Sequence, residues 1–161
     1  MELARIFIRL DQPLNAIEIY EKALQKYPNE INFYLSIGRI WDQLNDSAKG
    51  LEFYKKTLAL DSCNFEAIAN VAAFHFYSDQ PEISLRFYKR LIQLGINNSE
   101  IWNNLGLCCF YNGQYDLFWT CFERALKLAD PLTKAEIWFN ISHVFFNNLD
   151  FYRSWRFKTC L

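Results

Sequence analysis

The chain has 161 residues, of which 52% are hydrophobic and 18% aromatic, and its formal net charge is −1. Nucleic-acid binding needs clustered cations that displace counterions, so the scattered Lys and Arg residues argue against a nucleic-acid partner. The longest apolar stretches, such as residues 71–77, are far shorter than the roughly 20 residues that span a bilayer, and charges interrupt residues 1–5, so we expect no membrane insertion, no secretory signal and a cytoplasmic location.

Small residues recur at a fixed interval along the chain. Ala4, Gly38, Ala72 and Gly106 are each 34 positions apart, and Ser142 follows after 36. A period near 34 indicates an array of helical hairpins. We therefore expect about five repeats: a partial first repeat at 1–30, complete repeats at 31–64, 65–98 and 99–134, and a divergent, incomplete repeat at 135–161.

Each repeat shows the pattern of two helices joined by a turn. When the small residue is numbered position 8, apolar residues at positions 4, 7, 8 and 11 form one helix face. A second helix carries positions 20, 24 and 27, as in Ala16, Tyr20 and Ala23. Turn-forming residues separate the two helices, and Pro13 and Pro81 stand where the first turn of a helix tolerates proline.

This pattern resembles the tetratricopeptide repeat over the whole chain. The resemblance implies an all-α fold, a right-handed superhelix (α-solenoid) of about five helix-turn-helix repeats. Small residues at positions 8 and 20 then let paired helices approach closely. Phe118 occupies a position 20 that is small in the other repeats, so we expect the fourth helix pair to be splayed. Residues 151–161 depart most from the repeat, and Met1 enters at position 5, so we expect a piece of a longer array.

The resemblance also implies a binding groove, because positions 2, 5, 9 and 12 of the first helices line the inner surface of such superhelices. Some proteins of this kind bind a free carboxylate with several cationic side chains. Arg39 is the only cation among the expected partner-binding residues, which argues against that binding mode. Position 12 predicts a ladder of phenylalanines, which either bind a protein segment or pack on each other in a tight superhelix. The expected partner-binding residues are Leu35, Arg39, Asp42, Glu66, Ala69, Ala73, Phe76, Glu100, Asn103, Leu107, Phe110, Glu136, Phe139, His143 and Phe146.

The Cys and His residues show no pattern that predicts a catalytic site. The odd number of cysteines and the absence of a C-x-x-C spacing encode neither a disulfide framework nor a metal site, and we expect no cofactor. We interpret the cysteines as small core residues, with a redox role for the Cys108-Cys109 pair as the alternative. His75 falls at inward position 11 and is expected to be a hydrogen-bonded core residue. The cysteines are Cys63, Cys108, Cys109, Cys121 and Cys160.

Three stretches are more specific than the generic repeat. Residues 75–91, 103–111 and 122–126 resemble the Bardet-Biedl family of tetratricopeptide repeat proteins. This resemblance implies a non-enzymatic scaffold subunit of the BBSome, a coat-like complex that moves membrane proteins into and out of cilia. Its implied partners are protein subunits of that complex, one of which lays an extended or helical segment in the groove, and its implied location is the cilium, the ciliary base or the basal body.

Two other functions stay open on the residues alone. One is a general adaptor or co-chaperone that binds peptide segments. The other is the regulatory repeat region of a larger enzyme. The chain itself does not identify the subunits or the cargo.

Overall fold

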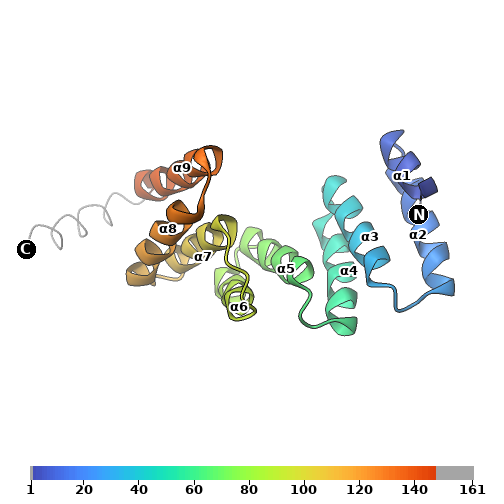
Figure 1. Cartoon of the computed structure of the whole chain (residues 1–161), viewed down its shortest axis with the longest axis horizontal. Helices are drawn as coiled ribbons and strands as arrows, with labels where there is room; N and C mark the ends of the chain where they lie inside the picture. The colour runs from blue at the N-terminus through green and yellow to red at the C-terminus, as the bar shows by residue number, and fades with distance from the viewer. Residues whose placement is uncertain (1, 148–161) are drawn as a thin grey trace, which may run out of the picture. The chain divides into compact units, whose positions relative to one another are not determined.

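The structure, a computed structural model, describes residues 2–147, and within that range it contains helices and no β-strand (Figure 1). The all-α solenoid expected from the sequence is confirmed. Successive helices form the predicted hairpins, and α9 begins at Pro131, ahead of the expected boundary at residue 135. The helices are α1 (Glu2–Arg9), α2 (Pro13–Lys26), α3 (Ile31–Gln43), α4 (Ser47–Leu60), α5 (Phe65–Tyr77), α6 (Pro81–Gln93), α7 (Ser99–Tyr111), α8 (Tyr115–Leu128) and α9 (Pro131–Asn147).

The turn inside each repeat has one conformation. Asp11, Asn45, Asp79 and Gly113, which are spaced by the repeat period, all have a positive φ between 56° and 68°. The residue after each of them donates its N–H to a carbonyl five residues back, as Gln114 does to Cys109 at 2.8 Å. This is the Schellman ending of a helix, in which Gly, Asn and Asp tolerate the left-handed conformation.

Polar side chains also fix where several helices begin. Asn64 accepts a hydrogen bond from the N–H of Ala67 at 3.0 Å, and Asn98 accepts one from Ile101 at 2.8 Å. Asn is a strong N-cap because its side-chain oxygen satisfies an N–H that has no partner within the helix. The first helices of the third and fourth repeats, α5 and α7, therefore start at equivalent positions.

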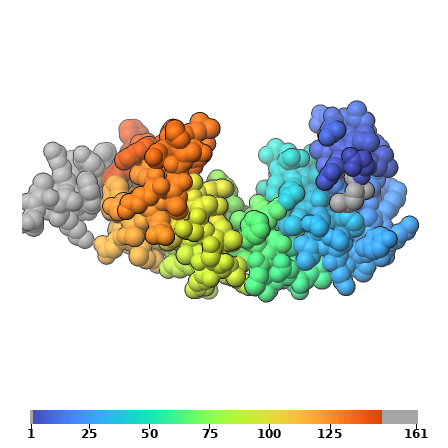
Figure 2. All heavy atoms as spheres, in the orientation of Figure 1, coloured from blue at the N-terminus to red at the C-terminus, as the bar shows by residue number. Residues whose placement is uncertain are grey.

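The chain divides into two compact units, residues 1–87 and 88–161, with the boundary inside α6. Unit 1 has two clusters of buried side chains, one built on Ile37 and Tyr20 between α1, α2 and α3, and one built on Tyr54 and Val71 between α3, α4 and α5. The space-filling view shows the outer surface of the described helices in the same residue colours (Figure 2).

The small residues at position 8 allow large rings to cross the seam between paired helices. A Cβ added at Gly38 would lie 2.8 Å from Cε1 of Tyr54, and one added at Gly106 would lie 2.7 Å from Cε2 of Phe122. The approach at Gly106 is as close as the one at Gly38 although Phe118 is fully buried in the same helix pair. The expectation that Phe118 splays this pair is therefore wrong.

The core of unit 2 is rich in aromatic rings. Phe118 packs on Phe122 with ring centroids 4.8 Å apart, and Phe145 of α9 packs on Trp119 at 5.4 Å. The contact between Phe145 and Trp119 seats α9 against α8. The divergent stretch 151–161 and Cys160 lie outside the described residues.

Candidate partner-binding surfaces

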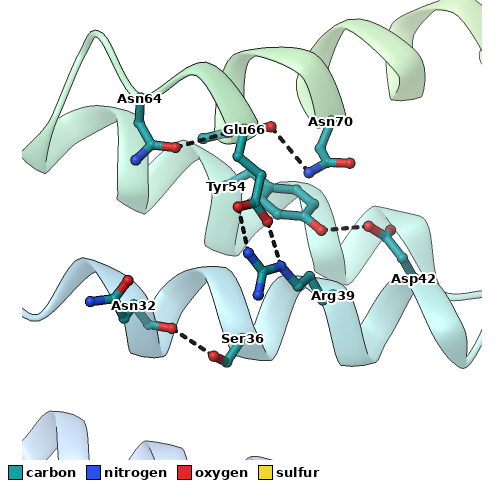
Figure 3. A network of polar contacts seen from close by, with 9 residues as sticks. Asn32, Ser36, Arg39, Asp42, Tyr54, Asn64, Glu66 and Asn70 are labelled. Atoms are coloured by element: carbon teal, nitrogen blue, oxygen red, sulfur yellow. Dashed lines mark hydrogen bonds and ion pairs between the residues drawn. The ribbon is translucent and has the colours of Figure 1, made fainter. Parts of the chain in front are cut away.

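In unit 1, an ion pair connects the first helices of two successive repeats. Arg39 of α3 donates two hydrogen bonds, from Nε and Nη2, to the two carboxylate oxygens of Glu66 on α5 (Figure 3). The hydrogen bond to Glu66 raises the pKa of the Arg39 guanidinium. Two parallel bonds of this kind are the geometry in which arginine binds a carboxylate most strongly. Arg39 is thus already engaged within the chain.

Asp42 is held by a second polar contact in the same unit. The hydroxyl of Tyr54 donates to Oδ2 of Asp42 at 2.6 Å (Figure 3). Burial raises the pKa of Tyr54, with the Asp42 hydrogen bond as a further cause. Tyr54 therefore stays protonated and keeps the Asp42 carboxylate against α4.

The other predicted groove residues of unit 1 are less exposed than expected. Leu35 is buried in the core cluster with Tyr54 and Val71, and so it does not lie on an open face. Ala69, Ala73 and Phe76 are half-buried. The polar residues predicted for the groove in unit 1, Arg39, Asp42 and Glu66, are therefore each held by a contact within the unit.

In unit 2, two predicted groove residues are also buried. Phe110 is covered by Phe118, with ring centroids 5.4 Å apart, and by Tyr115 at 5.6 Å. Asn103 accepts a hydrogen bond from Nδ2 of Asn140 at 3.2 Å, which joins α7 to α9. The expectation that Phe110 and Asn103 stand on an open surface is therefore not met, whereas Leu107 is half-buried.

Among the described residues of unit 2, the most exposed large apolar side chains lie along α9. Phe139 is 68% exposed, Phe146 81% and Leu132 78%. His143 is exposed as well, and its ring stacks on Phe139 with centroids 6.3 Å apart. Residues at these spacings share one face of a helix. We call Leu132, Glu136, Phe139, His143 and Phe146 the α9 stripe.

A polar pocket lies next to the α9 stripe. Its volume is about 240 Å³. Glu100 of α7 and Glu136 of α9 are both exposed and bring two carboxylates to it. The pocket is lined by Asn98, Ser99, Glu100, Asn103, Thr133, Glu136 and Ile137.

Sequence reasoning missed Leu132 because α9 starts before the expected repeat. Asp130 caps this earlier start by accepting from the N–H of Thr133 at 2.8 Å, an interaction that lowers the pKa of Asp130. An Asp followed by a Pro in the first turn is a known helix start and could have revealed it. Trp138 stands at position 4 of the last repeat, which the repeat pattern places on the packing face, yet it is 57% exposed.

The cysteines divide into a buried group and one exposed residue. Cys108, Cys109 and Cys121 are buried, as expected for core residues, whereas Cys63 is exposed, so its assignment to the core is wrong. A hydrogen bond between the Cys109 and Cys121 thiols lowers the pKa of Cys109 and raises that of Cys121. His75 stacks on Phe87 and its Nδ1 lies 2.7 Å from Oε1 of Gln80.

Among the described helices, none combines the length and the apolar character required to traverse a bilayer. Within residues 2–147, no three side chains of His, Cys, Asp or Glu gather as a metal site would require.

The family model described as "Tetratricopeptide repeat" matches residues 1–30 and 99–131. Among curated proteins, tetratricopeptide repeat protein 8 of Mus musculus is 48% identical over 143 residues, which cover 88% of this chain and 28% of that protein. The Homo sapiens protein of the same name is 52% identical over 143 residues, covering 88% of this chain and 26% of that protein. The chain therefore spans little more than a quarter of the length of these two relatives.

Solved structures share the fold at low identity. A crystal structure of MamA is 20% identical with a TM-score of 0.78, and the match covers 92% of this chain and 85% of that chain. YrrB, titled "a TPR protein with an unusual peptide-binding site", is 20% identical with a TM-score of 0.69, covering 82% of this chain and 67% of that chain.

Proposed function

We propose, on the premise that this chain is a tetratricopeptide repeat solenoid similar to tetratricopeptide repeat protein 8, that it is a non-enzymatic protein-interaction scaffold and part of a BBSome-like subunit. Such a subunit holds neighbouring proteins in a fixed geometry during the transport of ciliary membrane proteins. Its location is then the cytoplasm, at the cilium, the ciliary base or the basal body.

The observation that carries this proposal is the similarity to tetratricopeptide repeat protein 8. About half of the residues are identical over 88% of the chain. MamA and YrrB share the fold with this chain at only 20% identity, so the fold alone does not account for an identity of about one half. The finer role comes from the resemblance of residues 75–91, 103–111 and 122–126 to the Bardet-Biedl family.

The exposed surface of α9 supports a role in assembly. Phe139 and Phe146 present aromatic rings to solvent, and burying each would contribute roughly 1.5–3 kcal/mol. Interfaces of permanent complexes are richer in such apolar groups than transient ones. The α9 stripe is therefore a surface that a stable partner would cover.

A general adaptor that grips a free carboxylate is less well supported. That mode needs charge-assisted donors, and Arg39 already gives its Nε and Nη2 hydrogens to Glu66. If the chain were a peptide adaptor, its binding would be exchangeable, of micromolar affinity and dependent on the C-terminus of the ligand. A regulatory region of a larger enzyme would instead co-purify with catalytic activity.

The test is purification of the tagged, full-length protein from ciliated cells, followed by size-exclusion chromatography and mass spectrometry. We expect co-elution with the other Bardet-Biedl proteins at fixed stoichiometry, through a high-salt wash. Recovery of the protein alone, or with chaperones that a peptide displaces, would contradict the scaffold role. A strain lacking one of the co-eluting subunits is the matched control, because a specific assembly should then shift in size.

A further inference from the structure

Unit 1 shows how this solenoid binds a guanidinium group between successive repeats. Arg39 occupies position 9 of the second repeat, and Glu66 occupies position 2 of the third. The two side chains form a bidentate pair on the faces of α3 and α5 (Figure 3). The arrangement needs an acidic residue at position 2 and a basic one at position 9 of the preceding repeat.

Unit 2 retains the carboxylate and lacks the cation. Glu136 stands at position 2 of the fifth repeat, but position 9 of the fourth repeat is Leu107. Helix α7 contains no Lys or Arg, and Lys134 of α9 lies about 160° around its helix from Glu136. Among the described residues, Glu136 and Glu100 form no ion pair.

The helix dipole does not account for Glu136. An acidic residue in the first turn interacts favourably with the helix N-terminus, which explains Glu100 in the first turn of α7. The first turn of α9 holds no acidic residue, and Glu136 follows it. Its exposed carboxylate lines the pocket of about 240 Å³ that Glu100 also lines.

The apolar part of the α9 stripe continues directly from this carboxylate. Phe139, His143 and Phe146 follow Glu136 at spacings of three, four and three residues, so this part of the stripe runs about 15 Å along one helix face. Apolar groups that recur at each helical turn match the spacing of anchors on a partner helix. Two carboxylates followed by an apolar helix face therefore favour a ligand that carries a cation next to apolar side chains.

We propose that the α9 stripe binds an amphipathic helix of a partner protein, and that an Arg or Lys of this helix enters the pocket to pair with Glu136 and Glu100. The partner's cation supplies in trans what Arg39 supplies to Glu66 within the chain. Its apolar side chains cover Phe139, His143 and Phe146. The inference rests on the proposed scaffold function and specifies the chemistry of the partner.

The probe is a phage-displayed library of random 16-residue peptides selected on the full 161-residue chain. We expect enriched peptides to carry Arg or Lys at a fixed helical spacing from apolar residues. The affinity of individual peptides is then measured by fluorescence anisotropy. Glu136→Gln should weaken binding about tenfold, because a charge-assisted pair is lost, and replacing the peptide's Arg by the neutral isostere citrulline should weaken it similarly.

The matched variant is Leu107→Arg, which places a cation at the position that Arg39 occupies in unit 1. We expect the new Arg side chain to pair with Glu136. It should therefore lower the affinity for Arg-containing peptides at least as much as Glu136→Gln does. Circular dichroism melting checks that both variants fold. If Glu136→Gln and Leu107→Arg bind the selected peptides as the wild type does, the proposed cation site is wrong.

Other outcomes also decide the question. A library that enriches no peptides, or peptides without basic residues, overturns the inference. Sedimentation of a wild-type dimer that Phe146→Ala converts to a monomer would show that a second copy covers the stripe, and would overturn it too. Each of these results leaves the co-purification of the full-length protein unaffected, so the scaffold function can hold when this inference fails.

Discussion

At the scale of single residues, the glycine at position 8 sets how closely two helices pack. A Cβ at Gly106 would lie 2.7 Å from the ring of Phe122, which is buried and cannot easily move. We expect Gly106→Ala to lower the stability of unit 2 by about 1–3 kcal/mol through overpacking, less the gain of up to about 1 kcal/mol in helix propensity. Amide hydrogen exchange of α7 and α8 measures this change.

Two variants test the cause of that loss. The double variant Gly106→Ala/Phe122→Leu should regain part of the protection, because the smaller side chain leaves room for the new methyl group. Ser142→Ala changes the same repeat position where the residue is exposed, so it should have little effect. Equal losses for Gly106→Ala and Ser142→Ala would mean that the seam is not the reason.

At the scale of helices, the Arg39–Glu66 pair connects α3 to α5 across one repeat. The side chain of Arg39 is 56% exposed and that of Glu66 25%, so solvent screens the interaction. A double-mutant cycle with Arg39→Met and Glu66→Gln should give a coupling energy of about 0.5–1 kcal/mol, measured by urea denaturation. The coupling should shrink in 1 M salt, where the Debye length falls to about 3 Å.

The control for this cycle is the pair Lys22 and Glu18, which lies within one helix and is well exposed on both sides. Its coupling should be smaller, because neither side chain is partly buried and no second helix is connected. A coupling energy of zero for Arg39 and Glu66, at low salt, would show that the two hydrogen bonds do not stabilise the contact between α3 and α5.

The turns and helices could be predicted well from the sequence, and the exposure of individual residues could not. The turn-forming residues predicted where the two helices of a repeat are separated, and the structure adds that Asp11, Asn45, Asp79 and Gly113 adopt the left-handed conformation there. A position in the repeat fixes the direction of a side chain on its helix. It does not fix how much of that side chain a neighbouring residue covers.

Phe110 shows why coverage escapes a pattern. It shares position 12 with Phe146, yet Phe110 is 5% exposed and Phe146 81%. Phe118, a large residue at a position that is small in other repeats, reaches Phe110 and covers it. The large side chain of Phe118, which predicted a splayed helix pair, is accommodated because it packs on the ring of Phe110. The phenylalanines at position 12 therefore do not form one uniformly exposed surface.

At the scale of the whole molecule, these two phenylalanines separate folding from binding. Phe110→Ala removes a buried ring and should destabilise unit 2 by about 3–5 kcal/mol, which hydrogen exchange of α7 would record. Phe146→Ala removes an exposed ring and should change stability by less than about 0.5 kcal/mol. If α9 is the surface that a partner covers, Phe146→Ala should nevertheless reduce co-purification of the full-length assembly. Unchanged co-purification together with unchanged stability would show that Phe146 is not among the residues that carry the binding energy, because burial of its ring would contribute roughly 1.5–3 kcal/mol.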